Sequence, residues 1–251
     1  GNIERSVPAI APDYFVLDLP VDRVNEFTTM VEEAAPGSQI NATPTLRGTV
    51  IAYGPENNPN VVAEMQEFPD GTWGLRGERG MTYSPTVPQG NVLTEGEWWE
   101  EDHAGEFLVS IDEELARAAG LQLGDIITVS ILGVQKTARI ANFRRLDWES
   151  LGFNYVFVFS PNTLADAPHN VAATVAFPSG TEPGTLLRDL ARAFPSSSVI
   201  EVGPILTEAR NILDQVALAI LAAASVAVLA GIAVLLGAIA AARAARIYDT
   251  V

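Results

Sequence analysis

The end of the chain differs sharply from the rest in its hydrophobic pattern. Residues 215–242 form a run of 28 residues without one charged side chain. A helix of this length measures roughly 42 Å, and the hydrocarbon core of a bilayer is about 30 Å thick. The alternative, a buried helix of a soluble core, is usually shorter and amphipathic at its ends. We therefore expect residues 215–242 to form a transmembrane helix.

The flanks of this apolar run predict its orientation. Arg243 and Arg246 follow it directly, whereas acidic residues precede it. Positively charged flanks tend to stay in the cytoplasm, so residues 243–251 are expected to begin a cytoplasmic segment and residues 1–214 to lie outside. The run is also rich in alanine, with serine and glycine interspersed, which favours packing against further membrane helices.

The first part of residues 1–214 shows a strand pattern, a helix pattern and a second strand pattern. Residues 14–19 are an apolar run typical of a strand, and residues 21–35 carry apolar positions at helical spacing. Residues 40–53 are again typical of a strand, with a bend expected at Pro44.

The last part repeats this order. Residues 155–159 and 171–177 are short apolar runs that predict strands, residues 185–194 predict an amphipathic helix, and residues 198–202 a further strand. Residues 204–214 are expected to be helical and to run into the membrane helix. Both strand–helix–strand units are expected to pair in one sheet.

The middle of the chain is different in character. Residues 54–90 are rich in Gly, Pro and Asn, which is typical of loops and short hairpins. Ser110 and Glu113 have the spacing of a capping box, and Gly120 is placed to end the helix that follows. Residues 126–143 then read as a β-hairpin. We interpret residues 54–150 as a β-rich insertion, which gives an α+β fold for the extracytoplasmic domain 1–214.

Charge and cysteine content exclude several classes of function. Residues 1–214 hold 13 basic and 30 acidic side chains, a formal charge of −17 within the −16 of the whole chain. Nucleic-acid binding needs a basic surface, so no nucleic-acid partner is expected. The chain has no cysteine, which excludes disulfides, thiol nucleophiles and cysteine-ligated metals.

The densest group of carboxylates lies between Glu95 and Glu106. A calcium loop would carry an Asp-x-Asp-x-Asp-Gly pattern, which is missing, so we interpret the stretch as a solvated acidic surface. The chain lacks a Gly-x-Ser-x-Gly motif around its serines, and its two histidines are His103 and His169. A phosphate loop is missing as well. We therefore expect no catalytic residue, no metal and no cofactor in this chain.

The most distinctive polar stretch is the charged and aromatic run at residues 144–148. Arginine pairs with carboxylate or phosphate in a bidentate manner, so this run is a candidate contact for a partner or a cargo. The alternative is an internal arginine–aspartate pair that fixes the loop. Two adjacent tryptophans belong either to the core or to an apolar contact surface. The candidate contact residues are Arg144, Arg145, Asp147, Trp148, Trp98 and Trp99.

Several stretches together resemble one family. They are APDYFVLDLP, VLTEGEWW, SIDEELARAAGLQLGDIITV, RRLDWESLGFNYVFVFSPNTLADAP and ILDQVALAI, in this order from about residue 10 onwards. They are similar to the FtsX/MacB-like ABC transporter permeases, and in particular to the YbbP-type branch. The chain begins with Gly1 and ends shortly after the apolar run, so we expect a fragment of a longer protein.

The resemblance implies a permease subunit of the bacterial inner membrane that has no catalytic residues of its own. A separate cytoplasmic ABC ATPase and the remaining permease helices would be its partners. The family fold is a mixed α/β Porter subdomain with a β-rich Sabre insertion, facing the periplasm. Such systems relay ATP-driven motion to export or extract hydrophobic cargo, and the YbbP-type branch is associated with a periplasmic esterase or lysophospholipase.

Two other functions remain open on the sequence. One is a single-pass extracytoplasmic sensor or binding ectodomain, which the membrane helix alone would equally suit. The other is a membrane-anchored esterase that uses His103 or His169 as its base. A neighbouring ATPase gene and further membrane spans would favour the permease.

Overall fold

The computed structural model describes residues 12–146, 153–181, 183–202, and residues 215, 216, 220 and 224. The chain divides into two compact units, residues 1–200 and residues 201–251, and the first is described here. Among the described residues, no helix has the length and apolar character needed to cross a bilayer.

Three predictions fall on the C-terminal part of the chain. The predicted helix at 204–214 and the predicted cytoplasmic start at 243–251 lie outside the described residues. The same holds for the predicted transmembrane helix 215–242, apart from four residues that are helical and exposed. The orientation of this segment therefore stays a prediction.

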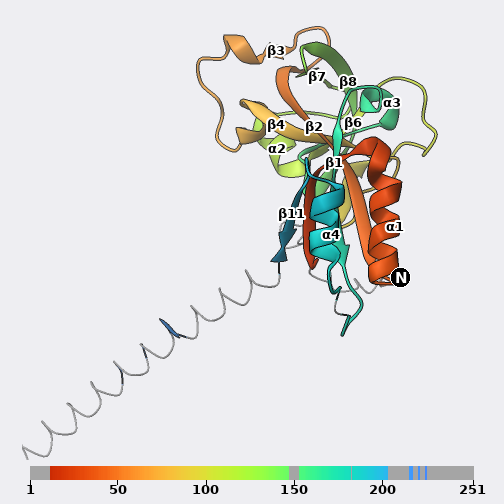
Figure 1. The fold of residues 1–251 in the computed structure, drawn as a ribbon. Coiled ribbons are helices and arrows are strands. Elements are labelled where there is room, and N and C mark those ends of the chain that lie inside the picture. The colour runs from red at the N-terminus through yellow and green to blue at the C-terminus, as the bar shows by residue number, and fades with distance from the viewer. Residues whose placement is uncertain are drawn as a thin grey trace, which may run out of the picture. The chain divides into compact units, whose positions relative to one another are not determined.

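One part of the fold is a layer of four strands covered by two helices (Figure 1). The strand order is β11 (Ser198–Glu201), β1 (Tyr14–Pro20), β10 (Asn170–Ala176) and β2 (Gln39–Gly54). The 3-10 turn η1 (Val21–Arg23) and helix α1 (Val24–Ala34) connect β1 to β2, and α4 (Leu186–Ala193) connects β10 to β11. The two predicted strand–helix–strand units thus share one sheet.

The two helices bury their apolar sides against each other and against the layer. Phe27 of α1 and Phe194 after α4 meet edge to face, with ring centroids 6.0 Å apart. Spacing of three and four residues places the buried side chains of each helix on one stripe, as the sequence pattern predicts. The buried members of this first core are Tyr14, Val16, Leu19, Phe27, Val31, Val171, Ala173, Val175, Leu186, Leu190 and Phe194.

The second part of the fold is a closed ring of strand pairings. In ring order its strands are β2, β4 (Glu78–Tyr83), β9 (Phe157–Phe159), β6 (Leu108–Asp112), β8 (Val134–Leu146) and β7 (Ile126–Ile131), which pairs with β2 again. The pairs β4–β9 and β6–β8 are parallel, and the others are antiparallel. A closed ring leaves none of its six strands with an open edge.

Shorter elements surround the ring. Strand β3 (Asn60–Val61) pairs with β2, and β5 (Asn91–Gly96) pairs with β8. Helix α2 (Glu113–Ala119) lies between β6 and β7, and α3 (Pro161–Leu164) follows β9. The 3-10 turns η2 (Val62–Glu64) and η3 (Trp73–Leu75) occupy the glycine- and proline-rich stretch.

The ring encloses its own apolar core. Its buried members come from every strand of the ring and from α2, and they include the aromatic residues Tyr53, Phe143, Phe157 and Phe159. The segment that supplies this second core runs from Leu46 to Leu164 and contains the predicted insertion 54–150. The described part of the chain therefore has two apolar cores in one compact unit.

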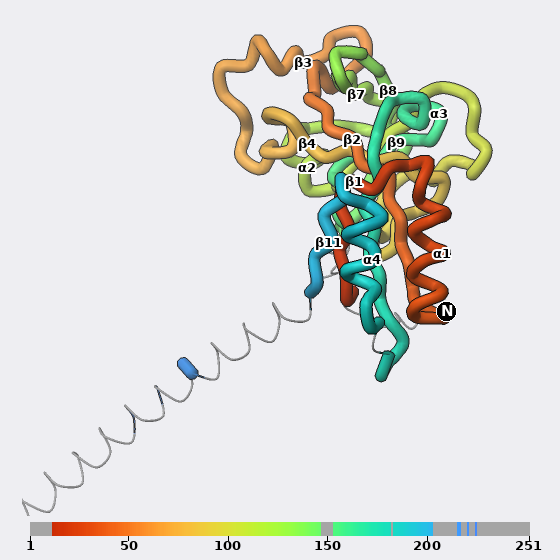
Figure 2. Tube along the Cα trace, in the orientation of Figure 1, coloured from red at the N-terminus to blue at the C-terminus, as the bar shows by residue number. Residues whose placement is uncertain are grey.

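Strand β2 connects the two cores (Figures 1 and 2). Its residues 39–45 pair with β10 in the first layer, and its residues 46–54 pair with β4 and β7 in the ring. The pairing partner changes between Thr45 and Leu46. An uninterrupted strand of 16 residues thus belongs to both parts of the fold.

Local predictions were confirmed where short-range chemistry decides the conformation. The hairpin at residues 126–143 is β7 and β8, joined through Leu132 and Gly133. Gly120 has a left-handed conformation, with φ of 67°, and its N–H bonds back to helix α2. Glycine adopts this conformation without steric cost, and it therefore ends the helix as predicted.

Two local predictions were wrong. Ser110 does not cap the helix, because it lies inside β6 with its side chain fully buried. Asp112 is the N-cap instead and accepts a hydrogen bond from the Leu115 N–H at 3.2 Å. The register of β2 against β10 runs without a break through Pro44, so the predicted bend is missing there. The irregularity in β2 lies between Val50 and Ala52.

Candidate functional site

The structure brings the two halves of the predicted contact region together. Strand β5 pairs with the end of β8 so that Val92 lies opposite Arg145 and Leu93 opposite Arg144. The two tryptophans follow β5 after one intervening residue, Glu97. Two of the predicted contact residues, Asp147 and Trp148, lie outside the described residues, as do the membrane-flanking Arg243 and Arg246.

Trp98 and Trp99 form a close pair with ring centroids 4.1 Å apart and ring planes inclined by 32°. Both indole N–H groups are used internally, because Trp98 donates to the Pro85 carbonyl at 3.0 Å and Trp99 to the Ser84 carbonyl at 2.9 Å. Trp99 is buried in the core, whereas Trp98 is half-buried. The pair ties the chain after β5 to the chain after β4, and Trp98 retains a face for contact.

The two arginines have opposite environments, because neighbouring residues of a strand point to opposite faces. Arg145 is exposed. Arg144 is fully buried, and its Nη2 donates to the Tyr155 carbonyl. A side chain without exposed surface cannot contact a partner. In this structure Arg144 therefore interacts with residues of the protein interior.

Burial lowers the pKa of Arg144 to about 9, and the carboxylate of Asp112 opposes this shift. Burial likewise raises the pKa of Asp112, which the Leu115 N–H and Arg144 oppose. Desolvation dominates both pKa shifts, because the interactions available in the interior do not fully replace the hydration that each charge loses on burial. The two residues lie directly opposite each other on β8 and β6.

Arg144 and Asp112 belong to a block of four polar side chains inside the protein, which we call the polar block. Ser110 lies opposite Asn142, two pairs away along the same two strands, and all four side chains are buried. Residues two apart on a strand share a face, so the block lies on one side of the β6–β8 pair. Of these four residues, the sequence pointed to Arg144 as a contact residue and to Ser110 only as a helix cap.

Much of the polar block has no hydrogen-bond partner within the described part of the chain. This applies to Ser110 Oγ, Asn142 Oδ1, and Nε and Nη1 of Arg144. Each buried polar group left in this way costs on the order of 1–3 kcal/mol. Stability alone therefore does not account for the polar block, which makes it a candidate functional feature.

The polar block is connected to the outside on one side and to β2 on the other. Asp112 also lines a hollow of about 460 Å³, together with Gly71, Trp73, Glu114 and Leu115. On the other side, Tyr155 receives the Arg144 hydrogen bond at its carbonyl and pairs through its hydroxyl with the Thr45 hydroxyl at 2.6 Å. Contacts thus lead from the hollow to the point where β2 changes partners.

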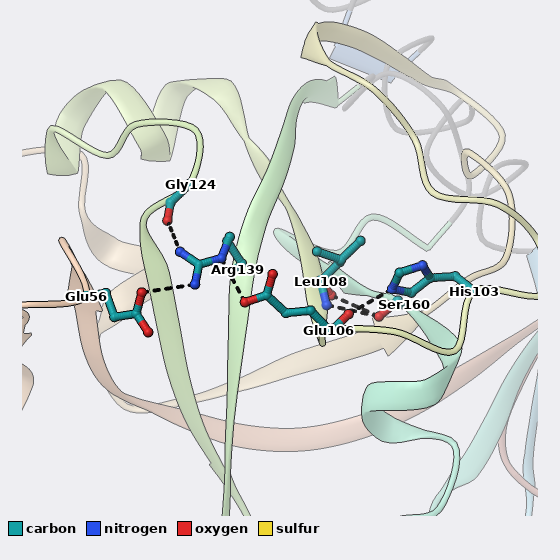
Figure 3. Close-up of polar contacts among 7 residues, drawn as sticks. All are labelled: Glu56, His103, Glu106, Leu108, Gly124, Arg139 and Ser160. Carbon is teal, nitrogen blue, oxygen red and sulfur yellow. Dashed lines mark hydrogen bonds and ion pairs between the residues drawn. The ribbon is translucent and has the colours of Figure 1, made fainter.

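A second polar cluster is centred on Arg139 of β8 (Figure 3). Its guanidinium donates to Glu106 at 2.8 Å, to Glu56 at 3.0 Å and to the Gly124 carbonyl at 2.8 Å. Both carboxylates raise the pKa of Arg139. These acceptors come from three separate loops, so Arg139 holds the loops together on the outside of the ring.

Neither histidine is placed to activate a serine among the described residues. His103 donates from Nε2 to the Glu106 carbonyl at 2.8 Å (Figure 3). His169 donates from Nδ1 to the Ala167 carbonyl at 2.7 Å, which leaves Nε2 to accept from the Tyr83 hydroxyl at 3.0 Å. Ser160 pairs with Thr163 at 2.9 Å instead of a base. Nucleophilic hydrolysis needs a serine within hydrogen-bond reach of its base.

The acidic stretch does not gather into a metal site in the part of the chain that the structure describes. No three His, Asp or Glu side chains are arranged there to hold an ion. The carboxylates of Glu95, Glu97, Glu100, Glu101 and Asp102 are all exposed.

Comparison with known proteins gives one sequence relative of note. The chain is 26% identical over 207 residues to an uncharacterized ABC transporter permease, YbbP, of Escherichia coli strain K12. The match covers 82% of this chain but 23% of that protein, so the chain spans about a quarter of the length of its curated relative. No protein-family model matches the chain.

Two solved structures are similar in fold. One is the periplasmic region of MacB from Actinobacillus actinomycetemcomitans, with 13% identity and a TM-score of 0.45, covering 83% of this chain and 97% of that one. The other is a domain assigned to a permease of Porphyromonas gingivalis, with 17% identity and a TM-score of 0.39, covering 69% of this chain and 81% of that one.

Proposed function

We propose that this chain, whose resemblance to ABC transporter permeases is supported by its curated relative, is the extracytoplasmic part of a permease subunit. In this proposal residues 1–214 face the periplasm, residues 215–242 cross the inner membrane and residues 243–251 enter the cytoplasm. The observation that carries it is the 26% identity to a permease over 207 residues. That similarity extends over most of the chain rather than over a single motif.

The domain would act as a mechanical relay and not as an enzyme. A separate cytoplasmic ATPase would hydrolyse ATP, and the membrane helices would pass the resulting motion to the first layer of the fold. Strand β2 supports such a role, because one uninterrupted strand belongs to both cores. A hydrogen-bonded strand transmits displacement along its length, because sliding by one residue against its neighbours would turn its side chains to the opposite face of the sheet.

The cargo of the proposed transporter would be hydrophobic, such as a lipid, a lipoprotein or an ester-type substrate. Arg145 and Trp98 are the predicted contact residues that the structure leaves accessible. A guanidinium suits an anionic headgroup and an indole face suits an apolar chain. A periplasmic esterase or lysophospholipase would process such cargo and is the proposed additional partner.

Co-expression of the complete reading frame with the neighbouring ATPase gene tests the proposal. We expect the two proteins to purify as one complex, with ATP hydrolysis faster in lipid nanodiscs than for the ATPase alone. Arg145→Ala is expected to reduce stimulation of this activity by added lipid cargo, whereas Arg47→Ala, at an exposed surface ion pair with Glu78, is the matched control. A complete gene that encodes one membrane span and no ATPase complex would favour the sensor ectodomain instead.

A further inference from the structure

The hairpin between β7 and β8 has an unusual turn. Leu132 and Gly133 both adopt positive φ, at 49° and 84°, which is the pattern of a type I′ turn. Asparagine, aspartate and glycine are the residues that suit this turn, because positive φ brings Cβ close to the following carbonyl oxygen. Glycine has no Cβ, and the short polar side chains of asparagine and aspartate offset the strain by local hydrogen bonds. Leu132 is also 75% exposed to solvent. Leucine is therefore an unfavourable choice here both for conformation and for solubility.

The surroundings of Leu132 are apolar. Val134, on the other side of the turn, is 59% exposed. Next to both lies a hollow of about 150 Å³, and we call these two residues with the hollow the apolar tip. The remaining residues that line the hollow are Ile131, Lys136, Leu164, Asp166, Ala167 and Pro168.

The rim of the hollow is polar and electrically balanced. Lys136 and Asp166 form an ion pair there at 2.9 Å, which links the hairpin to the chain after α3. An apolar centre beside a polar rim is the usual arrangement of an energetically important contact between proteins. Backbone strain that the fold does not require is also typical of functional positions.

We infer that the apolar tip is a docking site for a partner protein that inserts one leucine- or phenylalanine-sized side chain into the hollow. Size supports a side chain as occupant, because small-molecule pockets usually measure about 300–1,000 Å³, whereas a cavity near 150 Å³ takes a benzene-sized group. Charge argues against a second copy as the occupant, because it would bring two domains of −17 together.

The inference does not depend on the proposed transport function, since a sensor ectodomain would use such a docking site equally. Leu132→Asn removes the apolar contact and gives the turn its preferred Asn-Gly sequence. Leu123, which is 39% exposed in the connection between α2 and β7, offers the matched control Leu123→Asn. In the full-length protein we expect Leu132→Asn to keep or raise the unfolding midpoint. A lowered midpoint would show that leucine serves the fold and would overturn the inference.

A photo-crosslink tests the occupant. Benzoylphenylalanine is placed at Val134 of the full-length protein in its own cells, and the adduct is identified by mass spectrometry. We expect one protein partner, an adduct that Leu132→Asn abolishes and Leu123→Asn preserves, and binding of the purified partner that Leu132→Asn weakens about tenfold or more. An adduct with lipid or with a second copy of the chain, an adduct insensitive to Leu132→Asn, or no adduct would each overturn the inference.

Discussion

Arg144 and Asp112 lie directly opposite each other on parallel strands β8 and β6, and both are buried. The charge of each residue opposes the pKa shift that burial causes in the other. Neither residue has an ion-pair contact within 4 Å among the described residues. Two guanidinium nitrogens of Arg144 also lack a hydrogen-bond partner there. A buried pair of this kind is weak evidence for stability. It does, however, impose a large penalty on removing one member alone.

The first prediction concerns this pair. Arg144→Met is expected to destabilise the protein by about 3–5 kcal/mol, because it leaves the Asp112 carboxylate buried without an opposing charge. The double variant Asp112→Asn/Arg144→Met should recover most of that loss, since asparagine also serves as an N-cap for α2. Chemical denaturation of the four members of this cycle measures the effect. Additive losses in the double variant would contradict it.

The second prediction gives the pH dependence of the same loss. Burial raises the folded-state pKa of Asp112 above its unfolded value, so protonation favours the folded state, and this advantage is lost as pH rises through the raised pKa. Removing Arg144 raises that pKa further. The stability difference between wild type and Arg144→Met should therefore be smaller near about pH 4 than near about pH 7. A difference that does not vary with pH would show that Asp112 is not the group left uncompensated.

The third prediction concerns Gly96 at the end of β5. It has φ of 79°, and a Cβ there would lie 2.3 Å from the Ala141 carbonyl oxygen of β8. Gly96→Ala should separate β5 from β8 and displace the Trp98–Trp99 pair. The loss is expected to be roughly 1–3 kcal/mol beyond that of Gly77→Ala. Gly77 is the matched control because it has φ of 67° and a Cβ added there would meet nothing within 4 Å.

Near-ultraviolet circular dichroism distinguishes the two glycine variants independently of stability. Two indoles 4.1 Å apart couple electronically, so displacement of the pair should change the aromatic signal in Gly96→Ala but not in Gly77→Ala. Equal spectra in both variants would contradict the assigned pairing of β5 with β8.

The fourth prediction concerns the contact between Tyr155 and Thr45. Tyr155→Phe removes a 2.6 Å hydrogen bond to the strand that connects the two cores and should cost about 0.5–1.5 kcal/mol. Amide hydrogen exchange should increase in β2 around Thr45, because local opening there becomes easier. Thr128→Val is the control, since it removes an exposed hydroxyl pair with Thr137, and Thr128 lies opposite Ala52 of β2 rather than near Thr45. Equal exchange at Thr45 in both variants would count against a role for Tyr155 at this junction.

Local features of the fold were predictable from the sequence because short-range chemistry decides them. The hairpin follows from alternating apolar residues around Gly133, and the end of α2 follows from Gly120. The closed ring was not predictable, because it depends on pairings such as β4 with β9, which join residues far apart in the chain. The double role of β2 was hidden for the same reason, since a long strand pattern does not reveal its partners.

The candidate site was predictable only in part. The run at 144–148 was singled out by its charge, but the polar block also needs Ser110, Asp112 and Asn142. Polar residues alternate with apolar ones in both strands, and this pattern equally fits strands with one face in water. Burial on both faces depends on residues distant in the sequence, such as Tyr155, which accepts the Arg144 hydrogen bond, and a single sequence does not show it.

Movement of the domain during ATP turnover tests the central claim most directly. Val92, which is 55% exposed on β5, is replaced by cysteine in the full-length permease and labelled with a donor dye; this domain has no other cysteine. The complex with its ATPase is placed in nanodiscs that carry acceptor-labelled lipid. We predict energy transfer that changes between the nucleotide-free and ATP-bound states and returns after hydrolysis, and that stays in the ATP state when the ATPase cannot hydrolyse ATP. Constant energy transfer while ATP is being turned over would contradict the relay.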